Sequence, residues 1–114
     1  MKIENAIITD TMLGREDHGI LTFMLYVDLE AGSCGIGGYA LDYYDIQTKK
    51  RCYSAKSAEA VSKVLDIVGV NTWENLKGKY IRVKTNGWGE PIYEIGNILE
   101  DKWFNLKEFF NVGE

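Results

Sequence analysis

The chain has 114 residues, of which 46% are hydrophobic and 26% charged, as expected for one folded domain with a modest core. Its 17 acidic and 13 basic residues give a formal net charge of −4, without the basic excess of a general duplex-binding protein. No run approaches the roughly 20 apolar residues that a membrane-spanning helix needs.

The first ten residues, MKIENAIITD, have polar side chains where a signal peptide has its apolar core, so export is not expected. Cys34 and Cys52 lack the spacing of metal ligands and favour reduced thiols in a cytoplasmic protein over a disulfide. A small anionic ligand stays compatible with the net charge, because one or two arginines can hold a phosphate.

The first third of the chain predicts two strands. ENAIITDTML reads as the first strand, and the polar GREDHG after it reads as a loop. LTFMLYVDLE then alternates apolar and polar residues, so one face of this second strand should be buried.

A glycine-rich stretch follows, GSCGIGGYALDYYD at residues 32–45, and Gly35-x-Gly37-x-x-Ala40 matches the loosest dinucleotide-binding fingerprint. The match is accidental, because that fingerprint must open a helix and no amphipathic helix begins before Ser57. We expect a hairpin loop around Gly32 to Gly35 and then a strand, GYALDYY. Either another backbone or a ligand would approach this strand closely.

The second half predicts one good helix among strands. After a polar turn, DIQTKKRC, apolar residues recur at helical spacing from a cap at Ser57 to a stop at Gly69. Asn71 can cap a short helix that Gly78 ends. KYIRVKT and PIYEIGNIL read as strands joined by a turn at NGWGE, and the tail WFNLKEFFNV has helical spacing.

These elements predict a single α+β domain over residues 1–114. A mostly antiparallel sheet should pack around the central amphipathic helix, with a short helix and a C-terminal helix in addition. A doubly wound fold is excluded, because the first half has no helix to alternate with its strands.

Catalysis and metal binding find little support. His18 is the only histidine, and no serine or cysteine lies in a nucleophile motif that would use it. Asp17 and His18 could serve a small hydrolase in acid–base chemistry, which is the weakest of the functions considered. One histidine and two distant cysteines do not form a metal site. We therefore predict no catalytic residue, no metal and no cofactor.

The residue types that a nucleotide-like ligand needs are present: flat rings, cations for phosphate, and amide or carboxylate partners for ribose hydroxyls. They are Tyr39, Trp88 and Trp103 as rings, Arg15 and Arg82 as cations, and Asn86, Asn97 and Asp17 as hydroxyl partners. Most proteins of this size carry a similar set. Three of these residues also have a structural interpretation: Arg82 on a solvated strand face, Trp88 folded onto the core, and Trp103 closing the core or an oligomer interface.

Three segments resemble a family of small phage proteins: TMLGREDHGILTFMLYVDLEAGSCGIGGYALD, IVGVNTWENLKGKYIRV and IGNILEDKWF. The family is that of the Thoeris anti-defense sponges, which sequester glycocyclic ADP-ribose signals. The resemblance covers most of the chain, and its most specific part runs from MLGREDHGI to GIGGYALD.

The resemblance implies a protein of the infected bacterial cytoplasm that binds a cyclic nucleotide made by a TIR-domain enzyme and does not degrade it. It also implies a homo-oligomer built from dimers, with ligand at protomer boundaries and, in some members, cyclic oligonucleotides at a second site. Contacts are expected in LGREDHG and NGWG with Arg82 and Asn97 nearby, which adds Leu13, Gly14 and His18 to the residues named above. The alternative is a protein-binding inhibitor or adaptor that uses exposed aromatic residues such as Trp88 and Trp103.

Overall fold

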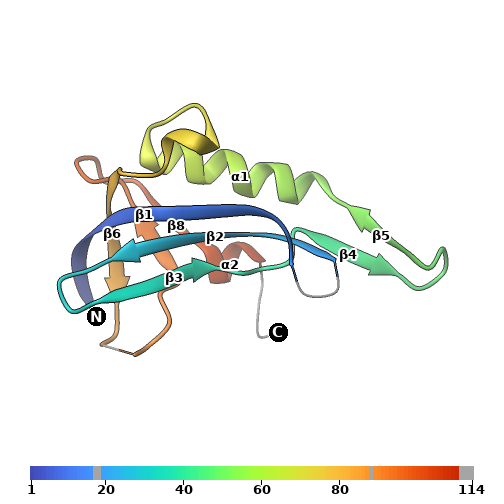
Figure 1. Ribbon diagram of the computed structural model, residues 1–114, viewed down its shortest axis with the longest axis horizontal. Helices are drawn as coiled ribbons and strands as arrows, with labels where there is room; N and C mark the ends of the chain where they lie inside the picture. Colours follow the sequence, from blue (N-terminus) through green and yellow to red (C-terminus); the bar gives the residue numbers. More distant parts are fainter. Residues whose placement is uncertain (17–18, 88, 111–114) are drawn as a thin grey trace.

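The computed structural model describes residues 1–16, 19–87 and 89–110, and it confirms the α+β class. The molecule is elongated, with extents of 46 × 29 × 23 Å (Figure 1). Its strands and helices, in chain order, are β1 (Lys2–Glu16), β2 (Ile20–Asp28), β3 (Ser33–Gly37), β4 (Asp42–Asp45), β5 (Lys50–Tyr53), α1 (Ala55–Val68), a 3₁₀ turn η1 (Trp73–Asn75), β6 (Tyr80–Thr85), β7 (Glu94–Gly96), β8 (Trp103–Asn105) and α2 (Leu106–Phe110).

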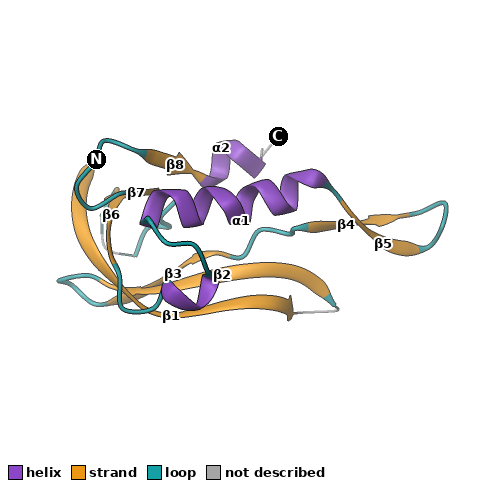
Figure 2. Ribbon diagram, turned by 90° about the horizontal axis from the view of Figure 1, so that it is seen from above, coloured by secondary structure: helices purple, strands orange, loops and turns teal. Residues whose placement is uncertain are grey.

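Six strands form one antiparallel sheet in the order β3-β2-β1-β6-β7-β8. The long strand β1 is its axis: the half from Lys2 to Ile7 pairs with β6, and the part from Ile7 to Glu16 pairs with β2. A bulge between Ile8 and Asp10 separates the two halves and bends the strand. The strands β4 and β5 form a separate hairpin that projects from the body (Figures 1 and 2).

The core lies between the inner face of this sheet and α1, which runs lengthwise beside the long strands β1 and β2 (Figure 2). Phe23, Leu25 and Val27 alternate along β2 and are all buried, as the sequence pattern predicts. The helix buries Ala60, Val64 and Ile67, while Val61, Leu65 and Val68 pack at the border of the core. No helix among the described residues has the length and apolar character that crossing a bilayer requires.

The ends of α1 confirm one boundary and correct the other. Gly69 ends the helix in the left-handed conformation, with φ 88°, and its N–H donates to the carbonyl of Leu65 over 2.8 Å. The helix begins at Ala55, earlier than predicted, and Ser54 rather than Ser57 precedes it. The Ser57 hydroxyl donates instead to the Ser54 carbonyl over 2.7 Å, inside the first turn.

The segments around the glycines differ from the prediction. The tight turn spans Leu29 to Gly32. Of the loop predicted at Gly32 to Gly35, the residues from Ser33 onward belong instead to strand β3, which runs to Gly37. Only the last three residues of the predicted strand GYALDYY lie in a strand, β4, which extends to Asp45. The predicted polar turn DIQTKKRC includes the first residues of β5, which begins at Lys50. Pairing with neighbouring strands decided these segments, since Gly and Ser have little strand preference of their own.

The C-terminal third has the predicted order with shorter elements. The short helix after Asn71 is only the 3₁₀ turn η1, and the strand expected over PIYEIGNIL is reduced to Glu94–Gly96. Trp103 lies on strand β8 and not on the predicted C-terminal helix, which is confined to Leu106–Phe110. The register places Trp103 opposite Gly96, so the aromatic residue belongs to the sheet.

Candidate functional site

A hollow of about 300 Å³ lies on the inner side of the sheet, at the end that the N-terminal part of β1 forms. The register shows its position: Glu4 pairs with the buried Val83, so its side chain is on the core-facing side of β1. None of the described lining residues belongs to α1, so the hollow lies beyond the part of the inner face that the helix covers. The walls come from β1, the β2–β3 turn, β3, the end of β6, and residues 87 and 89–92. The lining residues are Glu4, Leu29, Ala31, Ser33, Cys34, Gly35, Thr85, Gly87, Gly89, Glu90, Pro91 and Ile92.

The glycine-rich stretch and the NGWGE loop therefore meet at one place, although some 50 residues separate them in the sequence. Gly35 forms part of one wall, and Gly87 and Gly89 form part of the other. Three apolar side chains, Leu29, Pro91 and Ile92, line the space between these backbone segments. An apolar cavity with a few polar groups is the usual form of a small-molecule site.

The main polar feature inside the hollow is a pair formed by Glu4 and Thr85. The Thr85 side chain is almost fully buried, and its hydroxyl donates to Oε2 of Glu4 over 2.7 Å. The second carboxylate oxygen, Oε1, makes no hydrogen bond to any described residue. Glu4 thus offers acceptor capacity to whatever fills the hollow.

Cys34 lies in the same wall, with its thiol on the inner side of β3 opposite the buried Val27. Burial, and then the nearby carboxylate of Glu4, raise the pKa of this thiol above its ordinary value. The group is therefore neutral at pH 7 and serves as a small lining group rather than as a thiolate nucleophile. Both Cys34 and Cys52 are free.

The charge changes sign at the rim of the hollow. Lys2 is two residues before Glu4 on β1, so its side chain leaves the strand on the same face, roughly 7 Å further out. It lines a neighbouring depression of about 400 Å³ together with Asn86, and this depression shares Glu4 and Thr85 with the hollow. A carboxylate inside and an ammonium group at the rim are suited to a ligand with hydroxyl or amino groups at one end and an anion at the other.

Three of the predicted ligand residues lie close together: Arg82 and Trp103 meet on the outer face of the sheet, and the backbone carbonyl of Asn97 reaches the Arg82 guanidinium. Nε and Nη2 of Arg82 donate to the carbonyls of Asn97 and Glu100 over 2.7 and 2.8 Å. Its guanidinium lies 4.9 Å from the centroid of the Trp103 ring, and Lys84 lies over the same ring at 4.5 Å. These contacts fix the connection between β7 and β8 against β6.

The amide of Asn97 is also occupied within the protein. Its Nδ2 donates to the Ile67 carbonyl at the end of α1 over 2.8 Å, and its Oδ1 accepts from the N–H groups of Leu99 and Glu100. The Trp103 ring lies over Gly96, where a Cβ atom would come within 2.5 Å of it. The surrounding contacts give all three residues a structural role, whether or not a ligand also reaches them.

The described residues among those predicted in LGREDHG lie at the opposite end of β1. Leu13, Gly14 and Arg15 pair with β2 there, and Leu13 and Arg15 are exposed. Eleven residues separate Arg15 from Glu4 along the strand, which corresponds to roughly 35 Å. One protomer therefore does not bring these residues to the hollow. Asp17, His18 and Trp88 lie outside the described residues.

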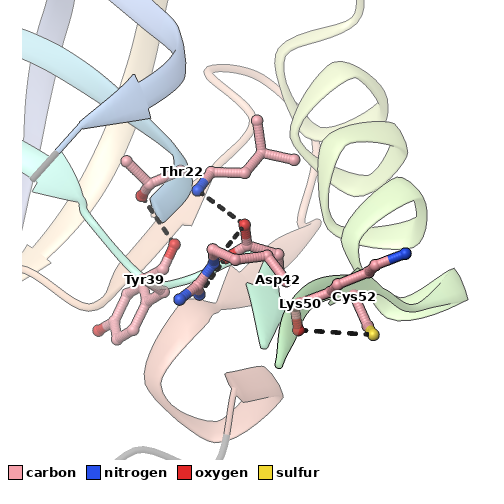
Figure 3. Close-up of polar contacts among 7 residues, drawn as sticks. Thr22, Tyr39, Asp42, Lys50 and Cys52 are labelled. Carbon is pink, nitrogen blue, oxygen red and sulfur yellow. Dashed lines mark hydrogen bonds and ion pairs between the residues drawn. The ribbon is translucent and has the colours of Figure 1, made fainter. Parts of the chain in front are cut away.

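The two remaining predicted residues separate as well. Asn86 is exposed at the rim of the hollow, as the depression around Lys2 shows. Tyr39 packs against the core and stacks on Phe110, with ring centroids 4.9 Å apart. Its carbonyl accepts a hydrogen bond from the Thr22 hydroxyl over 2.7 Å (Figure 3). Burial raises the pKa of the Tyr39 phenol above its ordinary value.

The glycines of the stretch at residues 32–45 have two different structural roles. At Gly37, with φ 119°, a Cβ atom would lie 2.6 Å from the Phe23 carbonyl oxygen, so the expected close backbone approach is confirmed there. At Gly35 a Cβ atom would meet Met24 at 2.6 Å on the outer face, while the glycine backbone lines the hollow. No helix follows either glycine, since β3 leads to β4.

A further polar cluster, centred on Asp42, holds the projecting hairpin, and its groups are hydrogen-bonded to one another (Figure 3). Asp42 receives two hydrogen bonds from Arg51, of 2.9 and 2.6 Å, and one of 3.1 Å from the Leu21 N–H. These bonds lower the pKa of Asp42, with the Arg51 bonds contributing most. The cluster joins β4 and β5 to each other and to β2.

The sequence did not reveal Glu4, Thr85 and Lys2 as site residues. One signal was present: Glu4 has the same alternation as the buried Ala6 and Ile8, so it marks a charged residue on an apolar face. Among the described residues no three His, Cys, Asp or Glu side chains are grouped as metal ligands. Models of known protein families, curated proteins and solved structures offer no match to this chain.

Proposed function

We propose that this protein binds a small nucleotide-type signal, of the cyclic ADP-ribose class, and sequesters it without degrading it. The observation that carries the proposal is the hollow, with Glu4 and Thr85 inside and Lys2 at its rim. This order of groups suits a sugar with an attached phosphate. The resemblance to phage sponges supports the signal class and a role in blocking TIR-dependent immunity in the cytoplasm of an infected bacterium.

The test uses purified protein and a set of cyclic ADP-ribose isomers. We expect one isomer to raise the melting temperature, because a ligand that binds the folded state alone stabilises it. Mass spectrometry after heat denaturation should recover that isomer unchanged. Recovery of hydrolysed product alone would make the protein an enzyme, and the absence of any shift with every isomer would contradict the proposal.

The projecting hairpin supports a second candidate, a protein-binding inhibitor or adaptor. Four large side chains on it are strongly exposed: Tyr43 at 52%, Tyr44 at 54%, Ile46 at 81% and Tyr53 at 66%. Exposed tyrosines on a protruding element are typical of contact surfaces between proteins.

Affinity capture from bacterial lysate distinguishes the two candidates. The adaptor predicts a stoichiometric protein partner that is lost when Tyr44 and Tyr53 are both changed to serine. The sponge predicts that the same double variant keeps its thermal response to the nucleotide. Loss of that response with a folded variant would place the ligand at the hairpin instead.

A further inference from the structure

We propose that Glu4, aligned by Thr85, reads the sugar hydroxyls of the ligand, and that the phosphate stays outside the hollow at Lys2. This inference rests on the proposed function and assigns the two ends of the ligand to two places. It also makes Glu4 the residue that determines specificity, a role that the sequence did not suggest.

The first step concerns charge inside the hollow. Its described lining contains two carboxylates, Glu4 and Glu90, and no lysine or arginine. A phosphate would meet like charge in a partly desolvated space, which is strongly unfavourable. The part of the ligand that enters must therefore be uncharged or cationic.

The second step concerns hydrogen bonding. Oε2 of Glu4 accepts from the Thr85 hydroxyl at 2.7 Å, which holds the carboxylate in one orientation. Its Oε1 then remains as an acceptor, and a carboxylate can accept further bonds at either oxygen. A vicinal diol supplies two adjacent donors for such a group, and charge-assisted bonds of this kind are among the strong ones.

The third step concerns the anion. Lys2 leaves β1 on the same face as Glu4 and roughly 7 Å further out, a separation comparable to the span of a sugar phosphate. Asn86 lines the same depression and can donate from its amide. The rim thus offers a cation and a neutral donor, whereas the interior offers acceptors.

Cys34 supplies a reporter inside the hollow. Its thiol lines the wall, while Cys52 lies on the projecting hairpin and serves as the internal control. A ligand in the hollow should slow alkylation of Cys34 by N-ethylmaleimide and leave Cys52 unaffected. Each variant's own rate without ligand is the reference, so changes in thiol reactivity do not enter the comparison.

The experiment titrates four probes into the full chain: adenosine, 2′,3′-dideoxyadenosine, AMP and, as a cation without a sugar, putrescine. We expect adenosine and AMP to protect Cys34 and the dideoxy compound to protect it at least tenfold less, because it lacks both sugar hydroxyls. Glu4→Gln should weaken protection by both active probes about tenfold or more. Lys2→Ala should weaken protection by AMP alone.

The matched control is Glu74→Gln, which removes the same charge from the exposed 3₁₀ turn and should change nothing. Circular dichroism establishes that each variant is folded. If Glu4→Gln does not fold, the dideoxyadenosine comparison and Lys2→Ala still test the proposal, because both leave the Glu4–Thr85 pair intact.

Four results would overturn the inference: equal protection by the dideoxy compound, no effect of Glu4→Gln, loss of adenosine protection in Lys2→Ala, or stronger protection by putrescine than by adenosine. The last would make the hollow a cation site. A cyclic ADP-ribose isomer that raises the melting temperature without protecting Cys34 would overturn this inference and leave the proposed function intact. Protection of Cys34 by adenosine without a response to any cyclic isomer would contradict the proposed signal class and leave the roles of Glu4 and Lys2 standing.

Discussion

The carboxylate of Glu4 lowers the reactivity of the Cys34 thiol, and this reactivity can be measured directly. Burial and then Glu4 raise the pKa of the thiol from its ordinary value of 9.0, because both disfavour the thiolate. Glu4→Gln removes the second cause, so the pKa should fall and the thiolate fraction at pH 8 should rise. We expect faster alkylation of Cys34 in this variant, followed by mass spectrometry of the labelled peptides.

Two controls accompany this measurement. Cys52 should react at the same rate in both proteins, and Glu74→Gln should leave the rate at Cys34 unchanged. A slower or unchanged rate at Cys34 in Glu4→Gln would mean that the Glu4 carboxylate does not raise the pKa of this thiol.

Asp42 has a structural role that depends on pH. Its side chain is 2% exposed and is paired with Arg51, whose side chain is 29% exposed. Asp42→Asn should lower the free energy of unfolding by about 2 kcal/mol at pH 7, since it leaves the guanidinium without its charged partner. Urea denaturation followed by circular dichroism measures this difference.

The pKa of Asp42 in the folded state is below its ordinary value of 3.8, so the ionised form is the one that folding favours. Its contribution is present above pH 3.8 and is lost as the pH falls through the lowered pKa. The difference in unfolding free energy between wild type and Asp42→Asn should therefore shrink only when the pH falls below 3.8. The exposed pair Glu59–Lys63 is the comparison, because Glu59→Gln should change stability by less than about 0.5 kcal/mol.

At the scale of elements, strand β3 depends on a glycine that no other residue replaces well. At Gly37 the φ of 119° and a Cβ position 2.6 Å from the Phe23 carbonyl oxygen both oppose a side chain. Gly37→Ala should destabilise the fold by about 3 kcal/mol, because the backbone would be strained and β3 displaced from β2. Chemical denaturation of the variant gives the value.

Gly14→Ala is the matched control for this substitution. Gly14 lies on β1 with no positive φ, and the nearest atom to its Cβ position is the Met12 sulfur at 3.9 Å. Its replacement should change stability by no more than about 0.5 kcal/mol. Similar values for the two variants would show that the approach of β3 to Phe23 is not what requires glycine.

The elements that the sequence predicted well are long enough to show the alternation of a strand or the 3.6-residue repeat of a helix. The alternation in β2 and the helical spacing that ends at Gly69 are local signals, and the structure confirms both. The strands β7 and β8 have three residues each and exist because Ile95 pairs with Val83 and Phe104. No local pattern encodes those pairings.

The same distinction holds for the site. The sequence indicated the NGWGE loop, and its glycines do border the hollow. It did not indicate Thr85, whose place beside Glu4 follows from the pairing of β1 with β6 across 81 positions in the chain. Arg82 was singled out as a cation for a ligand, yet its contacts with Asn97 and Glu100 hold a loop.

At the scale of the whole molecule, the predicted contacts at residues 13–15 and the hollow around Glu4 are too far apart for one protomer to bring both to one ligand. Arg15 is roughly 35 Å along β1 from Glu4, and the longest extent of the molecule is 46 Å. A ligand that touched both would have to lie between two copies of the chain. The expected homo-oligomer therefore becomes a geometric requirement if both groups contact the same ligand.

Two variants, Glu4→Gln and Arg15→Ala, test this requirement through complementation. Alone, each should lose binding of the responsive cyclic ADP-ribose isomer, because every shared site contains one altered residue. In a mixed dimer one site carries both changes and the other carries neither. Refolding an equal mixture should therefore restore about a quarter of the binding sites of the unaltered protein.

Isothermal titration of the mixture counts the sites, and light scattering gives the oligomer mass in multiples of the 12.9 kDa chain. Adenosine, which needs only the hollow, should bind Arg15→Ala as well as it binds the unaltered protein. If the chain is a monomer, or if the mixture binds no better than either variant alone, Arg15 and Glu4 do not share a ligand. The hollow would then be a complete site within each protomer, and residues 13–15 would have a separate role at the free end of β1.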